Sequence, residues 1–167
     1  LHEGQSVLVQ VIKDPINSKG ARLSTLVSVA GRLLVYLPHE KHIGISQRIE
    51  KEAERDSLRE KITRLVPEDE PGGFIVRTVA ENASEEELAN DIAYLRKIWS
   101  DIQSHALTVA PPSLLYQELP LGLRVLRDFV NPDTLRIIID SRENFQKLSV
   151  FANEFTPKVV PLLNHYI

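Results

Sequence analysis

The strongest structural constraint in this 167-residue sequence is an apolar stripe between residues 88 and 106. Six residues recur there at spacings of four and three, which is the periodicity of one helix face: Leu88, Ile92, Leu95, Trp99, Ile102 and Ala106. Ser84 and Glu87 precede the stripe at the spacing of a capping box, in which each side chain satisfies a free backbone N–H of the first turn. The pattern therefore predicts a helix of about five turns that begins after Ser84.

Short β-rich segments come before this helix. Residues 6–12 are rich in Val and Ile, and residues 21–30 alternate between apolar and polar side chains. A loop that contains Pro, Asn, Ser and Gly lies between them, so the two segments are predicted to form a hairpin. Further strands are expected at 33–37 and 74–76, with a helix at about 53–65, where apolar residues fall near one face.

In the last third of the chain, predicted strands and helices alternate. Leu114–Tyr116 is a strand candidate, 121–130 reads as a helix, and 135–140 is a largely apolar strand. Ser141 is placed to cap a helix over about 142–155. This alternation favours α/β layering, and the whole chain is predicted to have a mixed α+β fold.

Composition excludes several classes of protein. The chain contains no Cys, so disulfide scaffolds, Cys-ligated zinc and thiol nucleophiles are excluded within it. It also contains no Met, even at position 1, and we expect it to be a fragment of a longer protein. Its apolar runs are far shorter than the roughly 18 residues of a membrane span, so no membrane partner is expected.

The basic residues are distributed unevenly. Residues 1–48 hold six basic and three acidic residues, a balance of +3, whereas the formal charge of the whole chain is −3. A basic hairpin joined to an acidic remainder could follow a phosphate backbone. Ordinary surface charge explains the same balance, and the charge pattern alone leaves both interpretations open.

Arg77 and Thr78 end the predicted strand at 74–76. A guanidinium fork beside a hydroxyl suits a phosphate with free oxygens, because Arg binds such a group in a bidentate way and keeps its charge. An ordinary surface Arg beside a turn Thr is the common alternative.

Other candidate sites are weaker. His39 and His42 lie close together, but no carboxylates are placed around them to complete a metal site. Asp140 follows a predicted buried strand, where many α/β enzymes place a catalytic carboxylate, so a small-molecule enzyme that uses Asp140 is one alternative. It requires a pocket with a second titratable group, and the sequence offers no candidate for that group. Gly72-Gly73 precedes a strand, which is the wrong order for a phosphate loop.

Six segments, in order and at matching spacing, resemble the ribonuclease E/G family, and the spellings favour its ribonuclease G branch. They are VIKDPINSKGARLST, RLLVYLP, GISQRIE, GGFIVRT, the helix segment YLRKIW, and RVLRDF. The resemblance implies three domain parts. Residues 1–28 would be closing strands of an OB-fold β-barrel, 29–120 a small mixed α/β sensor of the RNA 5′ end, and 121–167 part of a ribonuclease H-like α/β domain.

The resemblance also implies roles for individual residues. Arg77 and Thr78 match the pair that grips the RNA 5′-monophosphate, and Gly31 and Val35 match positions whose backbone lies against the terminal nucleotide. The RNA-facing basic residues of the family are matched by Lys13, Lys19 and Arg48. Gln47 stands where the ribonuclease E branch has Arg, so the sequence departs from that branch at this position.

A function follows from the resemblance as an expectation. The whole protein would be a bacterial, cytoplasmic, single-strand-preferring endoribonuclease of ribosomal RNA processing and mRNA decay, and a homo-oligomer. Its partner would be single-stranded RNA with a 5′-monophosphate. Mg²⁺ and a structural Zn²⁺ would be held outside this chain, which would carry no cofactor or catalytic residue and would be inactive alone. A stand-alone, non-catalytic RNA-binding module is the alternative.

Overall fold

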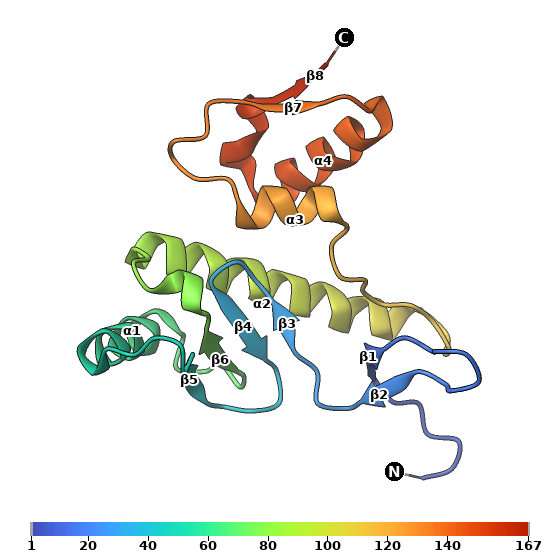
Figure 1. Ribbon diagram of the computed structural model, residues 1–167. Coiled ribbons are helices and arrows are strands. Elements are labelled where there is room, and N and C mark those ends of the chain that lie inside the picture. Colours follow the sequence, from blue (N-terminus) through green and yellow to red (C-terminus); the bar gives the residue numbers. More distant parts are fainter. Residues whose placement is uncertain (1, 167) are drawn as a thin grey trace. The chain divides into compact units, whose positions relative to one another are not determined.

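The computed structural model describes residues 2–166 and divides into two compact units, Leu1–Leu115 and Tyr116–Ile167. Helices and short β-sheets occur in the chain (Figure 1), which confirms the predicted mixed α and β class.

The first unit is centred on a four-stranded sheet in the order β3 (Val29–Ala30), β4 (Leu34–Leu37), β6 (Gly73–Val76) and β5 (Ile43–Ile45). β4 runs antiparallel to β3 and to β6, whereas β5 runs parallel to β6. Because Leu34 pairs with Val76, the end of β6 comes to lie beside the turn between β3 and β4. This register places the residue after β6 next to that turn.

Two helices cover the sheet: α1 (Glu52–Leu65) contacts β5, and α2 (Glu85–Thr108) contacts β3 and β4. Both helices were expected, and the capping box of Ser84 and Glu87 is present. The core lies between the helices and the sheet, where its largest fully buried side chains include Leu34, Tyr36, Phe74, Leu58, Ile62, Leu88 and Leu95.

The predicted hairpin is present, but its second strand is divided. β1 (Gln10–Lys13) pairs antiparallel with β2 (Arg22–Ser24) in a separate two-stranded sheet. The prediction of one strand over 21–30 was therefore wrong, because its end forms β3 of the central sheet. The hydroxyl of Ser24 accepts a hydrogen bond from the N–H of Leu26 at 3.1 Å. A bend of this kind interrupts the strand.

The second unit contains α3 (Leu121–Asp128), β7 (Ile137–Ile139), α4 (Arg142–Phe155), the 3₁₀ helix η2 (Pro157–Leu162) and β8 (Leu163–His165), with β7 and β8 parallel. Ser141 caps α4 by accepting from the N–H of Asn144 at 3.3 Å, as its position predicted. The expected strand at Leu114–Tyr116 was wrong. Those residues are irregular, since no neighbouring strand pairs with them among the described residues.

Candidate functional site

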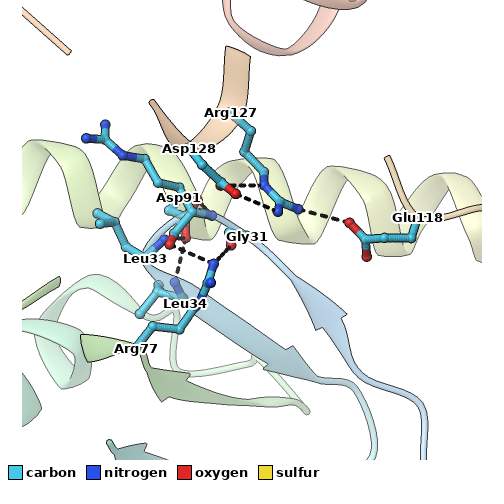
Figure 2. A network of polar contacts seen from close by, with 9 residues as sticks. Gly31, Leu33, Leu34, Arg77, Asp91, Glu118, Arg127 and Asp128 are labelled. Carbon is cyan, nitrogen blue, oxygen red and sulfur yellow. Dashed lines mark hydrogen bonds and ion pairs between the residues drawn. The ribbon is translucent and has the colours of Figure 1, made fainter. Parts of the chain in front are cut away.

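The candidate site is built on the turn that joins β3 to β4. The N–H of Gly31 donates to the carbonyl of Leu34 at 2.8 Å. The carboxylate of Asp91, on α2, accepts from three consecutive backbone N–H groups, those of Arg32, Leu33 and Leu34, at 3.0, 2.9 and 2.8 Å (Figure 2). A Cβ on Gly31 would lie 2.6 Å from Oδ2 of Asp91. Glycine is therefore required for the carboxylate to approach the turn this closely.

Arg77 holds the same turn by donating hydrogen bonds to the carbonyl groups of the turn. Its backbone N–H donates to Leu33 O at 2.8 Å, which continues the pairing of β4 and β6 by one residue. Its Nη1 donates to Gly31 O at 2.7 Å and to Arg32 O at 3.0 Å (Figure 2). Within residues 2–166, Nε and Nη2 of Arg77 make no further hydrogen bond. One edge of a half-buried guanidinium is thus left with its donors available.

Thr78 begins the short 3₁₀ helix η1 (Thr78–Ala80), directly after Arg77. Its Oγ1 lies 3.1 Å from Oγ of Ser46, which follows β5. Arg55 on α1 fixes the chain after Ser46, because its Nη1 donates to the carbonyls of Ser46 at 2.8 Å and Ile49 at 3.1 Å. The hydroxyl of Thr78 therefore lies in a half-buried, hydrogen-bonded setting supplied by three separate elements.

The other residues expected to bind RNA lie on several different elements of the first unit. Val35 is half-buried in β4, between Ala30 of β3 and Ile75 of β6. Arg48 is exposed two residues after Ser46. Lys13 and Lys19 are exposed in the β1–β2 hairpin, outside the central sheet.

The structure thus brings Arg77 and Gly31 into direct contact, with Thr78 next along the chain. It places Val35 and Arg48 on segments that flank them, Lys13 on a separate sheet, and Lys19 in the loop between the two strands of that sheet.

Sequence reasoning missed Asp91 and Ser46. Asp91 had a detectable signal, because it lies three residues after Leu88 and four before Leu95, on the apolar face of the predicted helix. A charged residue on a buried face requires partners. Ser46 had no comparable signal, since it lies 32 residues from Thr78 along the chain.

A second buried carboxylate, Glu70, lies elsewhere in the first unit. It accepts from the hydroxyl of Tyr36, from the N–H of Gly72 at 3.2 Å and from Nε of Arg96 at 2.6 Å. Burial by itself would raise the pKa of Glu70, but these hydrogen bonds and the charge of Arg96 outweigh it and lower that pKa below its ordinary value. Glu70 therefore remains an anion and ties α2 to the sheet.

The second unit has a cavity of about 330 Å³ lined by Asp140 and Lys147. This supplies the second titratable group that the small-molecule enzyme alternative required and that the sequence had not revealed. Nζ of Lys147, however, already donates to Oε1 of Glu143 at 2.6 Å, and the cavity lining is otherwise mainly apolar. The pair therefore offers weak support for acid–base chemistry.

Among residues 2–166, no group of three or more His, Asp or Glu side chains could hold a metal ion. No helix in this part of the chain is long and apolar enough to cross a membrane.

Comparison with known proteins relates the chain to a family of nucleases. The model of the Ribonuclease E/G family matches residues 28–167. The chain is 43% identical to Ribonuclease G of Escherichia coli K12 over 99% of its own length and 34% of that protein. It is 41% identical to Ribonuclease G of Haemophilus influenzae, over 95% of the chain and 32% of that protein. It is 34% identical to Ribonuclease E of Nostoc sp., over 97% of the chain and 24% of that protein. The chain thus spans about a third of the length of the ribonuclease G relatives.

Proposed function

This chain belongs to the ribonuclease E/G family, and we propose that it recognises the 5′-monophosphate end of single-stranded RNA for an endoribonuclease. The binding residues in this proposal are Arg77 and Thr78. One observation carries it: the side chain of Arg77 binds the β3–β4 turn through Nη1 alone, so its Nε–Nη2 edge is held in one orientation, and Thr78 is the next residue along the chain.

The selectivity would come from charge and hydrogen bonding. A terminal monophosphate carries a charge of about −1.5 to −2 at pH 7 and three acceptor oxygens. The planar edge of Arg77 can donate two parallel hydrogen bonds to such oxygens, and Thr78 can donate a third. A 5′-hydroxyl end has no phosphate to accept them, so the donors are left without their partner.

The remaining residues of the proposal extend the contact along RNA. Gly31 is buried, and both its backbone N–H and its carbonyl are already bonded within the protein, so in this proposal it contributes backbone of fixed position next to the terminal nucleotide. Val35 would extend this contact from β4, where it pairs with Ala30, the residue before Gly31. Lys13, Lys19 and Arg48 are exposed cations suited to phosphates further along the strand.

Domain identities form part of the same proposal. We assign β1 and β2 to the closing strands of an OB fold, and this is supported by exposed apolar side chains on that hairpin, such as Val11 and Leu23, each 54% accessible. The unit Tyr116–Ile167 is assigned to a ribonuclease H-like domain, supported by its parallel β7–β8 pair with α4 between them.

RNA cleavage, in this proposal, belongs to the longer protein. We assign no catalytic step to the described residues. We propose that Mg²⁺, a structural Zn²⁺ and homo-oligomer contacts involve other parts of that protein. Ribosomal RNA processing and mRNA decay in the bacterial cytoplasm are proposed from the family resemblance.

The test compares two short, single-stranded RNAs of one sequence, one with a 5′-monophosphate and one with a 5′-hydroxyl, by fluorescence anisotropy on the 167-residue chain. We expect the monophosphate RNA to bind at least about tenfold more tightly, since a hydrogen bond to a charged group contributes about 1.5–3 kcal/mol. Arg77→Ala should remove most of this preference, and Thr78→Val should reduce it.

Arg59→Ala is the matched control. Arg59 is an exposed residue of α1 paired with Asp56 at 3.1 Å, so its loss removes the same charge without touching the site. We expect Arg59→Ala to weaken the binding of both RNAs slightly and to the same extent. Equal binding of the two RNAs by the folded wild-type chain would refute the proposal.

A further inference from the structure

We propose that Asp91 is a positioning residue for the 5′-phosphate site, which it serves by presetting the β3–β4 turn that orients Arg77. This inference rests on the proposed function. Asp91 would not touch RNA. It would act through the turn, so that replacing its carboxylate removes the preference for a 5′-monophosphate while the unit remains folded.

The N–H side of the turn is held by Asp91. Three successive N–H groups, those of Arg32, Leu33 and Leu34, converge on its two oxygens, Oδ1 taking the first and Oδ2 the other two. Consecutive N–H groups that point to one place form a concavity that favours an anion. Here that anion belongs to α2, more than 50 residues away in the sequence, so the turn conformation depends on where α2 packs.

The carbonyl side of the turn is held by Arg77. Its Nη1 carries two hydrogens, and the carbonyls of Gly31 and Arg32 accept both of them. A planar guanidinium with two bonds from one nitrogen has little freedom to rotate. The direction of its Nε–Nη2 edge is therefore set by the two carbonyl positions, and those depend on the turn that Asp91 holds.

The chemistry requires a carboxylate at this place. An Asn at position 91 has one acceptor oxygen, and its amide NH₂ would face at least one backbone N–H, donor against donor. Gly31 imposes a second requirement, because a Cβ there would collide with both oxygens of Asp91, at 2.6 and 2.8 Å. Asp91 and Gly31 should therefore behave as a coupled pair.

The experiment measures the ratio of affinities for 5′-monophosphate and 5′-hydroxyl RNA with the 167-residue chain, together with the thermal midpoint. We expect Asp91→Asn to reduce the ratio roughly tenfold, by misplacing the charge-assisted hydrogen bonds of Arg77. Glu70→Gln is the matched control, since Glu70 is also a buried carboxylate of the same unit that accepts a backbone N–H. It should lower the midpoint and leave the ratio unchanged.

A double-mutant cycle tests the coupling without relying on Asp91→Asn. Gly31→Ala should reduce the ratio in the wild-type background, because its Cβ displaces the carboxylate. In the Asp91→Ala background the oxygens are gone, so adding Gly31→Ala should change the ratio less than about twofold.

The possible outcomes separate the two proposals. A wild-type chain that binds both RNAs equally refutes the proposed function, and this inference with it. A selective wild type with an equally selective Asp91→Asn overturns this inference alone. So does a Gly31→Ala effect of the same size in both backgrounds, which would mean that residue 31 acts on RNA directly. A parallel loss of the ratio in Glu70→Gln would also overturn it, by showing that general loosening of the unit suffices.

Discussion

Replacing Glu70 with Gln should destabilise the first unit measurably. The carboxyl group of Glu70 is 4% accessible and uses Oε1 for Tyr36 and Gly72 and Oε2 for Arg96. Gln can keep the oxygen that faces Tyr36 and Gly72, but its amide NH₂ then meets the Nε–H of Arg96. One charge-assisted hydrogen bond is lost, and one buried donor is left facing another.

The magnitude follows from these contacts. Losing a hydrogen bond to a charged group costs about 1.5–3 kcal/mol. Arg96 is 45% accessible and recovers part of its solvation from water, so the lower part of that range applies. We expect a loss of about 2 kcal/mol, which lowers the midpoint by about 4–8 °C for a chain of this size.

Fluorescence of Trp99 is the assay, because this sole tryptophan is 8% accessible and its ring centroid lies 6.5 Å from that of Tyr36. Asp56→Asn is the control: it removes an exposed carboxylate of α1 paired with Arg59, and should change the stability by less than about 0.5 kcal/mol.

The pH dependence of stability gives an independent test of the same prediction. The pKa of Glu70 is lowered in the folded state, so its contribution is present above the unfolded pKa, about 4.3, and is lost as the pH falls through the folded value. The wild type should therefore exceed Glu70→Gln in stability by a constant amount above about pH 5, and the gap should close at lower pH. A gap that is absent at pH 7, or that widens on acidification, would refute the reasoning.

Substitutions at three further positions test the elements that hold the site. Gly73→Ala should cost about 3 kcal/mol on urea unfolding, because its Cβ would lie 2.2 Å from the backbone oxygen of His42, which cannot move without breaking the β5–β6 pairing; a near-neutral result would contradict the register. Ser84→Ala should cost about 1 kcal/mol by the same measurement, through loss of the α2 cap, and Ser84→Thr should recover most of it. Ser46→Ala should lower the preference for 5′-monophosphate RNA severalfold with little change in stability, since it removes the partner of the Thr78 hydroxyl; an unchanged preference would show that Thr78 needs no such partner.

Much of the helical structure could be predicted from the sequence. The stripe through Leu88 and Leu95 and the capping box at Ser84 predicted α2, and Ser141 predicted the start of α4. Helix hydrogen bonds join residues four apart, so the information lies within a few turns of sequence.

Strands were harder to predict. The segment at 21–30 alternates as one strand would, yet it serves two different sheets, and Leu114–Tyr116 pairs with nothing among the described residues. Strand hydrogen bonds require a partner from elsewhere in the chain, which periodicity does not identify.

The candidate site likewise has features that the sequence predicted and contacts that it did not. Arg77 and Thr78 stood out from the sequence because a guanidinium beside a hydroxyl is itself a phosphate-binding chemistry, and their role in binding RNA stays a prediction. The tertiary structure alone decided three contacts. Gly31 faces Asp91, Ser46 contacts Thr78, and one nitrogen of Arg77 is already bonded to the β3–β4 turn. The sequence by itself determined which donors and acceptors the chain carries. The packing of α2 on the sheet and the pairing of β6 with β4 and β5 decided which of them meet, because their contacts join residues 32 to 59 positions apart.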